Sequence, residues 1–269
     1  MFKVTVIGCG KMGSSIVKAL LSGENFLPEE IVCCDHHKDN LCELDKLYGV
    51  VTTSDILSAI KGCELIILAV KPNAIPLLAR ELQGKLEGQL ILSIAAGVTL
   101  KKLQELFKYE RVVRSMPNLA VQVALSTTVW IASKELNEDD IRKTEIVLNS
   151  LGSSFRVYSE DLIDTATAIA GSGPAYQYLF MEALVEAGVR LGLSRELAYK
   201  LTLNMVKGSV SLAEINGEDF AALRYKVTTP GGTTAEALYS LEKNSFRASI
   251  LEAAKVCYER SRELAKVEH

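Results

Sequence analysis

The sequence predicts an α/β protein with a doubly wound sheet in its first part and an all-α domain after it. Over about the first 155 residues, short apolar runs alternate with amphipathic stretches, as in a mostly parallel sheet covered by helices. Strand-like runs stop after about residue 160. Because 269 residues are long for one domain and short for three, we expect two domains, at residues 1–157 and 158–269.

The first part alternates predicted strands and helices. The run from Leu65 to Val70 has no charge, as expected for a strand that helices cover on both faces. Met12, Ile16 and Leu20 are spaced four apart and share one helix face. The predicted strands are residues 2–7, 30–34, 50–52, 65–70, 89–94, 111–114 and 127–131. The predicted helices are residues 12–20, 40–48, 56–61, 75–86, 100–106 and 139–151.

The second part is predicted to be helical throughout. A long helix over residues 172–191 has Pro174 in its first turn and Gly192 just past its end. Ser194 is a suitable N-cap for the next helix, which ends near residue 215. Further helices are expected at residues 220–225, 234–241 and 246–266. Apolar faces on nearly every helix favour a dimerisation domain over a self-contained bundle.

Charge and hydropathy exclude several classes of protein. Lys and Arg total 30 against 33 Asp and Glu, so no basic excess indicates nucleic acid as a partner. The apolar run at residues 65–70 is far shorter than the roughly 20 residues that span a bilayer, so we expect no membrane segment. The apolar stretch near the N-terminus is too short for a secretion signal, and we expect a cytoplasmic protein.

The six cysteines and three histidines have no spacing typical of a metal site. No CxxC pair occurs, and Cys33 and Cys34 lie in an apolar stretch, which indicates buried thiols in a strand. The histidines are His36, His37 and His269. We therefore expect no metal.

Residues 8–13 read Gly-Cys-Gly-Lys-Met-Gly, after the first predicted strand and at the start of the first helix. In this GxGxxG pattern the first glycine permits a tight turn, the second lets a pyrophosphate approach the backbone, and the third lets helix and strand pack closely. The helix N-terminus then faces the phosphates. This context favours a Rossmann-type dinucleotide site over a glycine turn without a ligand.

Asp35 lies 22 residues past Gly13, at the end of the second predicted strand. A carboxylate there would bind a ribose 2′-hydroxyl and repel a 2′-phosphate, which favours NAD. His36, His37 and Lys38 follow directly and could neutralise a phosphate, or could be solvated loop residues. These residues leave the choice between NADH and NADPH open.

Three further unusual segments follow predicted strands: residues 69–72 (Ala-Val-Lys-Pro), 95–97 (Ala-Ala-Gly) and 116–118 (Met-Pro-Asn). Taken singly, each is equally well an ordinary loop. Ligands of open α/β sheets bind outside the carboxyl ends of the strands. Together with the glycine turn, the three segments therefore favour a cofactor site at that edge.

The helical part has two unusual loops, each at the start of a predicted helix. They are residues 171–176 (Gly-Ser-Gly-Pro-Ala-Tyr) and residues 228–234 (Thr-Thr-Pro-Gly-Gly-Thr-Thr). The second loop offers backbone N–H groups and hydroxyls at a helix N-terminus, which suits a small anion such as a carboxylate. The alternative is a helix cap in which Thr233 or Thr234 is the N-cap.

The chain has no Ser–His–Asp arrangement and no cysteine with a partnered histidine. A carbonyl reductase usually needs an acid that protonates the alkoxide, whereas an imine nitrogen can take its proton before the hydride arrives. The scarcity of histidine and lysine candidates therefore favours reduction of C=N over C=O.

In their order and spacing, these motifs resemble the pyrroline-5-carboxylate reductase family over essentially the whole chain. The loop around Pro230 is the most specific of them and the glycine turn is the least. The resemblance implies a Rossmann-type doubly wound sheet followed by an all-α dimerisation domain. It implies a homodimer, with a ring of dimers as a larger alternative. It also implies reduction of 1-pyrroline-5-carboxylate to L-proline with NADPH or NADH, the last step of proline biosynthesis.

The resemblance further implies individual residue roles. Thr234 would place its hydroxyl by the imine nitrogen and is the candidate catalytic residue. Gly232 and Thr233 would give N–H groups to the substrate carboxylate, and Glu160 would lie near the ring nitrogen. The implied substrate-binding residues are Glu160, Thr229, Gly231, Gly232, Thr233 and Thr234. The implied cofactor-binding residues are Ile7, Gly8, Gly10, Lys11, Met12, Gly13, Asp35, Asp55, Ala69, Val70, Lys71, Pro72, Ala95, Ala96 and Gly97.

Two positions differ from the family's usual residues. Many members have Ser or Arg near the end of the second strand, where this chain has Asp35 followed by two histidines. Many have Asn where this chain has Asp55. Both changes remove features that suit a 2′-phosphate, although the family is mostly NADP-dependent.

Two other functions remain as alternatives. A 3-hydroxy-acid dehydrogenase would share the glycine turn, but such enzymes generally carry a catalytic lysine in the first long helix of the second domain. Residues 174–191 contain no lysine. A nucleotide-sensing protein without turnover would share the fold, but the intact loop from Thr229 to Thr234 is unfavourable to that function.

Overall fold

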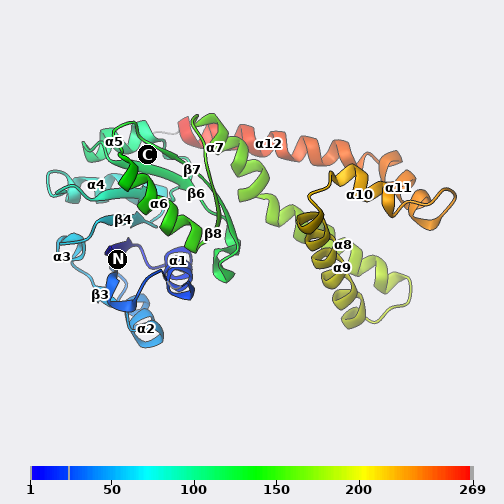
Figure 1. The fold of residues 1–269 in the computed structure, drawn as a ribbon, viewed down its shortest axis with the longest axis horizontal. Helices are drawn as coiled ribbons and strands as arrows, with labels where there is room; N and C mark the ends of the chain where they lie inside the picture. The colour runs from blue at the N-terminus through cyan, green and yellow to red at the C-terminus, as the bar shows by residue number, and fades with distance from the viewer. Residues whose placement is uncertain (1, 24, 267–269) are drawn as a thin grey trace. The chain divides into compact units, whose positions relative to one another are not determined.

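The computed structural model describes residues 2–23 and 25–266, and the chain divides into two units (Figure 1). The first unit is Met1–Ser172 with Cys257–His269, and the second is Gly173–Val256. His269, one of the three histidines, lies outside the described residues. The predicted domain boundary between residues 157 and 158 stays a prediction.

An eight-stranded sheet organises the first unit, in the order β3-β2-β1-β4-β5-β6-β7-β8. Neighbouring strands run parallel except β6 and β7. Because β1 lies between β2 and β4, the strand order changes direction at β1, which is where ligands bind in such sheets. The strands are β1 (Val4–Ile7), β2 (Ile31–Cys34), β3 (Val51–Thr53), β4 (Leu65–Leu68), β5 (Leu90–Ser93), β6 (Val112–Met116), β7 (Ser126–Ala132) and β8 (Gly152–Arg156).

Helices cover both faces of this sheet and form two apolar cores with it (Figure 1). Leu65 and Ile67 of β4 belong to one core, whereas Ile66 and Leu68 belong to the other, and all four are fully buried. This confirms that the run is covered on both faces. The first core includes α1 (Lys11–Ser22), α2 (Lys38–Tyr48) and α6 (Glu138–Ser150), and the second includes α3 (Ile56–Ile60), α4 (Ile75–Leu82) and α5 (Leu100–Phe107).

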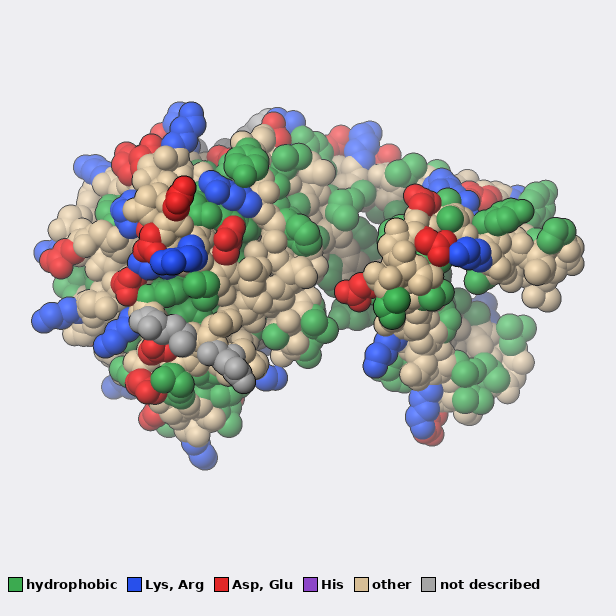
Figure 2. Space-filling view, viewed as in Figure 1, with side chains coloured by type: hydrophobic (Ala, Val, Ile, Leu, Met, Phe, Trp, Pro, Cys, Tyr) green, Lys and Arg blue, Asp and Glu red, His purple; other side chains and the backbone are tan. Residues whose placement is uncertain are grey.

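Short helical segments complete the first unit. Three are 3₁₀ turns: η1 (Pro28–Glu30), η2 (Pro72–Ala74) and η3 (Leu119–Val123). Near the end of this unit, α7 (Asp161–Ala166) continues into a π-helical turn, η4 (Thr167–Gly171). On the face that Figure 2 shows, basic and acidic side chains of this unit are interspersed, without a field of one sign.

The second unit is helical, as predicted. Its helices are α8 (Gly173–Arg190), α9 (Arg195–Asn216), α10 (Phe220–Lys226), α11 (Thr233–Lys243) and the first part of α12 (Phe246–Lys266). Ser194 caps α9 as predicted, because its hydroxyl accepts a hydrogen bond from the Leu197 N–H at 3.2 Å. In the part of the chain that the structure describes, no helix is long and apolar enough to cross a membrane.

The sequence analysis missed β8 and the π-helical turn. β8 has the sequence Gly-Ser-Ser-Phe-Arg, and all five residues are half-buried or exposed. In the described sheet it is the edge strand next to β7, so it needs no apolar run to belong to the sheet.

Candidate active site

The turn after β1 requires glycine at its first position. Gly8 has a φ of +92°, and its N–H donates to the Cys34 carbonyl oxygen at 2.8 Å. A Cβ atom at this position would lie 2.9 Å from the carbonyl carbon and oxygen of Ala69. The turn therefore brings the ends of β1, β2 and β4 together at one edge of the sheet.

The other two glycines of the turn differ in what surrounds them. A Cβ atom on Gly13 would lie 1.9 Å from the Gly8 carbonyl oxygen, whereas one on Gly10 would meet nothing within 4 Å. Gly10 is the N-cap of α1 and has no side-chain cap, so the N–H groups of Lys11 and Met12 have no acceptor within the helix. Open space beside unpaired N–H groups fits the diphosphate of a dinucleotide.

Asp35 follows β2, and its carboxylate is buried among hydrogen-bond donors. Oδ2 accepts from the Cys9 N–H at 2.6 Å, and Oδ1 accepts from the His37 N–H at 2.8 Å. The Asn40 amide donates to Oδ2 at 3.3 Å. Burial alone would raise the pKa of Asp35, but the hydrogen bonds from His37 and Cys9 outweigh burial and hold it below its usual value.

Asp35, His36 and His37 each place one potential ligand atom within 4.8 Å of the others. His36 Nδ1 lies 3.5 Å from Asp35 Oδ1, and the two imidazole rings are 4.0 Å apart. The three residues are consecutive, and the carboxylate already accepts two backbone N–H groups. We assign no metal to them.

Asp55 is the N-cap of α3. Its carboxylate accepts hydrogen bonds from the Leu57 N–H and the Ser58 hydroxyl. These hydrogen bonds lower the pKa of the Asp55 carboxyl group, and the bond from Ser58 has the largest effect. Both acidic residues predicted to bind the cofactor therefore also hold their own loops in place.

The cysteine of the glycine turn is buried and packs as an apolar side chain. Contact with Cys33, together with burial, raises the pKa of the Cys9 thiol, so it stays protonated. Burial also raises the pKa of Cys34, to about 11. Cys33 and Cys34 are buried in β2, which confirms the interpretation of that apolar stretch.

The ends of β4 and β5 lie beside the glycine turn. The Ala69 N–H donates to the Ile7 carbonyl oxygen at 2.8 Å, and the Ile94 N–H donates to the Leu68 carbonyl oxygen at 3.2 Å. Residues 69–72 and 95–97, which follow these strands, are thereby at the same edge as Gly8–Gly13. Their individual cofactor contacts stay predictions.

The structure brings together two motifs that are far apart in sequence. Asn118 Nδ2 donates to the Ala170 carbonyl oxygen at 3.0 Å, in the π-helical turn before Ser172. A Cβ atom on Gly171 would lie 3.6 Å from the Met116 methyl group. The Met-Pro-Asn segment therefore supports the entry to the Gly-Ser-Gly-Pro motif. π-helical turns are rare and frequently occur at functional sites.

In the second unit, the loop before α11 is a tight turn. The Gly232 N–H donates to the Thr229 carbonyl oxygen at 3.0 Å, and Gly231 between them has a φ of +68°. The positive φ favours glycine at position 231. A Cβ atom on Gly232 would lie 2.2 Å from Thr229 Oγ1 and 3.1 Å from the Thr229 carbonyl oxygen, so a side chain there would require Thr229 to move. The Gly232 N–H, predicted to bind the substrate carboxylate, is thus engaged within the loop.

Thr233 and Thr234 are the first two residues of α11, and Gly232 is the N-cap without a side-chain cap. The alternative in which one of these threonines is the N-cap is therefore wrong. Their N–H groups have no acceptor within the helix, and the macrodipole favours negative charge at this end. The loop thus suits a carboxylate, which it would bind through Thr233 and Thr234.

Glu160 lies just before α7 in the first unit, and one of its two carboxylate oxygens, Oε1, has two partners. Oε1 accepts from the Leu100 N–H at 2.9 Å and pairs with Arg114 at 2.9 Å. The sequence analysis missed Arg114. The available signal was a charge inside the apolar strand Val112–Met116, because a buried charge needs a partner.

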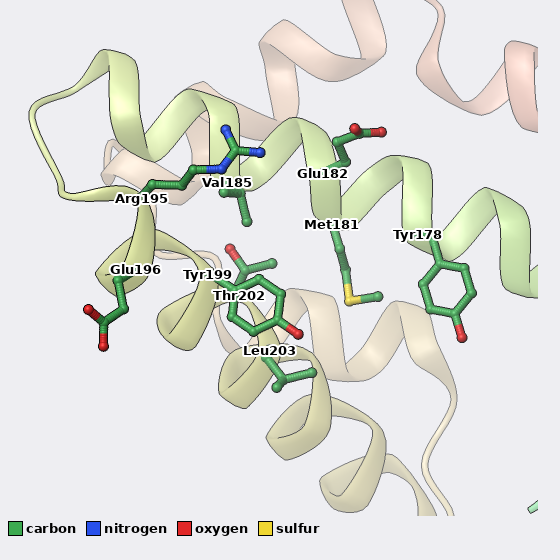
Figure 3. A pocket seen from close by; sticks show the side chains of 9 residues that line it. All are labelled: Tyr178, Met181, Glu182, Val185, Arg195, Glu196, Tyr199, Thr202 and Leu203. Carbon is green, nitrogen blue, oxygen red and sulfur yellow. The ribbon is translucent and has the colours of Figure 1, made fainter. Parts of the chain in front are cut away.

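A cavity of about 750 Å³ lies between α8 and α9 of the second unit. Figure 3 shows the side chains that line it. Tyr178, Met181 and Val185 line it from α8, and Tyr199 and Leu203 line it from α9. The polar and charged side chains of Glu182, Arg195, Glu196 and Thr202 complete the lining. None of the lining residues is among the predicted site residues. We therefore assign this cavity no role in the reaction.

Comparison with known proteins identifies the family. A family model described as pyrroline-5-carboxylate reductase dimerisation matches residues 160–264, and one described as NADP oxidoreductase coenzyme F420-dependent matches residues 3–97. Pyrroline-5-carboxylate reductase of Synechocystis is 37% identical over 97% of each chain. That of Arabidopsis thaliana is 34% identical over 98% of this chain and 96% of its own. The chain belongs to the pyrroline-5-carboxylate reductase family.

Solved structures confirm the predicted fold. A pyrroline-5-carboxylate reductase from Coxiella burnetii has a TM-score of 0.93 at 33% identity and covers 99% of both chains. The Plasmodium falciparum pyrroline carboxylate reductase, solved with NADP bound, has a TM-score of 0.89 at 32% identity and covers 98% of both. Aquifex aeolicus prephenate dehydrogenase, at 16% identity, shares the fold alone.

Proposed function

We propose that the chain is a pyrroline-5-carboxylate reductase, an NAD(P)H-dependent oxidoreductase that reduces the C=N bond of 1-pyrroline-5-carboxylate to give L-proline. The reaction is the last step of proline biosynthesis. The observation that carries this proposal is the 37% identity to a curated enzyme of that name over 97% of each chain. The 3-hydroxy-acid dehydrogenase alternative is disfavoured because α8 contains no lysine.

The cofactor, when bound, supplies a hydride to the carbon of the C=N bond. We place its diphosphate at Gly8–Gly13, where N–H groups open into free space, and its ribose and nicotinamide by residues 69–72 and 95–97. Asp35 and Asp55 line the adenosine end in this proposal. Their charges disfavour a 2′-phosphate, while His36, His37 and Lys38 favour it, so both NADH and NADPH are candidates.

The loop before α11 orients the substrate in this proposal. The N–H groups of Thr233 and Thr234 bind the carboxylate, and the Thr234 hydroxyl oxygen accepts a hydrogen bond from the protonated imine nitrogen. The hydride then forms the new C–H bond, and the electron pair of the C=N π bond moves to nitrogen, which leaves the amine of proline. No further acid is needed, so orientation supplies much of the acceleration.

We also propose that the second unit forms a homodimer, with a ring of dimers as the larger alternative. Support comes from the matched dimerisation family and from helices that bury almost none of their own side chains. A cytoplasmic location completes the proposal, supported by six cysteines that are all free thiols.

Replacing Thr234 tests the assigned roles. Thr234→Ala should lower kcat/KM for 1-pyrroline-5-carboxylate by roughly 10- to 100-fold, because one hydrogen bond at the reacting nitrogen is lost. Ser240→Ala is the matched control, since it removes an exposed hydroxyl from the same helix two turns on and should leave the rate unchanged. Steady-state rates of cofactor oxidation measure both. Unchanged turnover in Thr234→Ala would exclude this residue from the mechanism.

A further inference from the structure

A buried arginine lies next to the loop that joins β5 to α5. Arg114 of β6 is only 3% exposed and pairs in register with Ser93, the last residue of β5. Residues 94–99 follow Ser93 directly and lead into α5. A guanidinium buried to this degree needs an oppositely charged partner, because an unpaired charge is strongly disfavoured away from water.

Two carboxylates pair with this arginine. Its Nη1 lies 2.9 Å from Glu160 Oε1, and its Nη2 lies 3.2 Å from Asp164 Oδ1. Of the two, Glu160 also contacts the β5–α5 segment, because its Oε1 accepts the Leu100 N–H at 2.9 Å. A continuous set of contacts therefore runs from Arg114 through Glu160 to Leu100, the first residue of α5.

This carboxylate satisfies an N–H group that the helix itself cannot pair, and its negative charge lies at the favourable end of α5. The hydroxyl of the N-cap Thr99 accepts from the Lys102 N–H and so leaves the Leu100 N–H to Glu160. The β5 end of the loop is fixed without Glu160, because the Ala95 N–H donates to Ser93 Oγ at 3.2 Å. Glu160 therefore fixes the α5 end of the loop, and Arg114 fixes Glu160.

We propose that Glu160 and Arg114 are positioning residues for the nicotinamide half of the cofactor site. Through Leu100 they hold residues 95–97 in the conformation that accepts the ring. The proposal rests on the proposed function, because these residues flank a nicotinamide only if the chain binds the cofactor there. Both contacts use Oε1, which leaves Oε2 for the predicted contact with the substrate nitrogen.

The test compares two ligands without substrate present. The dissociation constant of the reduced cofactor is measured beside that of the matching fragment without nicotinamide: 2′-phospho-ADP-ribose for NADPH, or ADP-ribose for NADH. Glu160→Ala should weaken binding of the cofactor about 10-fold and leave the fragment within about twofold. Glu160→Gln keeps an oxygen that accepts the Leu100 N–H, so its effect on the cofactor should be smaller.

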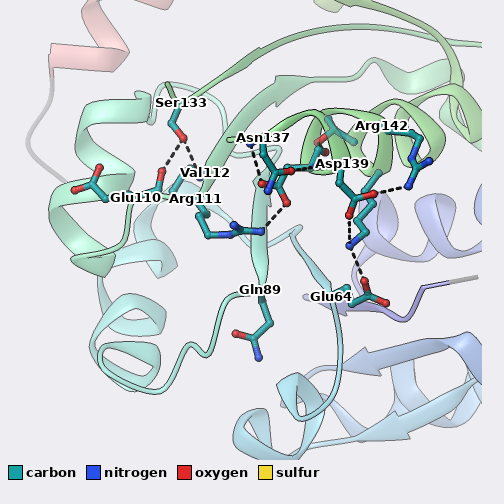
Figure 4. Close-up of polar contacts among 12 residues, drawn as sticks. Glu64, Gln89, Glu110, Arg111, Val112, Ser133, Asn137, Asp139 and Arg142 are labelled. Atoms are coloured by element: carbon teal, nitrogen blue, oxygen red, sulfur yellow. Dashed lines mark hydrogen bonds and ion pairs between the residues drawn. The ribbon is translucent and has the colours of Figure 1, made fainter. Parts of the chain in front are cut away.

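Asp140→Asn is the matched control. It disrupts another ion pair, between the buried Asp140 carboxylate and the partly exposed Arg111 at 2.6 Å. Figure 4 labels Arg111 in this group of polar contacts. Among the residues that the structure describes, neither Asp140 nor Arg111 forms a hydrogen bond with the β5–α5 loop. Thermal stability should therefore fall while both dissociation constants stay unchanged.

Two results would overturn the inference: cofactor binding by Glu160→Ala equal to wild type, or an equal loss for cofactor and fragment, which a merely structural role would give. If the wild-type protein binds neither ligand, the proposed function fails, and the inference fails with it.

Discussion

The Asp35 carboxylate ties the end of β2 to the glycine turn, because it accepts the N–H groups of both Cys9 and His37. The residue is 8% exposed, so these charge-assisted hydrogen bonds are shielded from water. A single side chain thus couples the adenosine end of the proposed cofactor site to the diphosphate end.

Asp35→Asn should lower the free energy of unfolding by about 2 kcal/mol near neutral pH, since charge-assisted hydrogen bonds become neutral ones. The folded-state pKa of Asp35 lies below its unfolded value, which is about 3.9. Its stabilisation is therefore complete above about pH 5 and is lost as the pH falls through the folded-state pKa. Urea unfolding between pH 7 and pH 3 measures this. A difference between variant and wild type that stays constant across this range would contradict the assignment.

For single residues, the sequence predicted which residues belong to the candidate site better than it predicted their hydrogen-bond partners. Gly8, Asp35 and the Thr229–Thr234 loop were singled out by residue type, because few residues fit those roles. The partners of Asp35, Asp55 and Glu160 depend on rotamers and on segments far away in the chain. Leu100 and Glu160, for example, are 60 residues apart and meet only in the folded sheet.

In the turn between β1 and α1, Gly13 and Gly10 are glycines for different reasons. Gly13 has no room for a side chain, because of the Gly8 carbonyl oxygen, whereas the space at Gly10 is open to the protein's exterior. The fold itself thus explains Gly13 but not Gly10. A ligand at the turn explains both.

Replacement of Gly13 by alanine should therefore affect stability, whereas replacement of Gly10 should affect cofactor binding. Gly13→Ala should lower the melting temperature by several degrees, because the new Cβ atom pushes α1 away from the turn. Gly10→Ala should leave the melting temperature unchanged and weaken cofactor binding about 10-fold or more, because the methyl group occupies the diphosphate's place. Thermal unfolding and cofactor titration measure the two effects. Unimpaired cofactor binding by Gly10→Ala would show that the diphosphate does not lie against Gly10.

The spacing of apolar residues was sufficient to predict those helices and strands that are deeply buried. The strand at Leu65–Leu68 and the helix at Lys11–Ser22 have apolar patterns that match one structure only. β8 has no such pattern, since an edge strand in contact with one neighbour can be polar. The π-helical turn at Thr167–Gly171 has no local sequence signal, and its backbone is supported by Asn118 from a distant loop.

The second unit has too little core of its own for its size. Val185 is the only buried residue of α8, and α10 and α11 bury none among the residues that the structure describes. Leu179, Tyr199, Leu203 and Met205 are about half exposed or more. Figure 2 shows hydrophobic side chains at the surface of this unit. An apolar surface of this extent is typical of a subunit interface.

Leu179→Glu should therefore convert the dimer to a monomer, because it buries a charge at the proposed interface. Leu47→Glu is the control: Leu47 is 60% exposed on α2 of the first unit, and its replacement should leave the assembly intact. Light scattering after gel filtration measures the mass of both variants. A dimer that persists in Leu179→Glu would place the interface elsewhere.

The most direct test of the whole account follows the hydride itself. The wild-type protein is given 1-pyrroline-5-carboxylate and cofactor deuterated at the transferring position, and the product is analysed by mass spectrometry. The account predicts one L-proline for each cofactor oxidised, with deuterium on the carbon of the former C=N bond. Cofactor binding without formation of labelled proline would contradict it and would leave the nucleotide sensor as the better description.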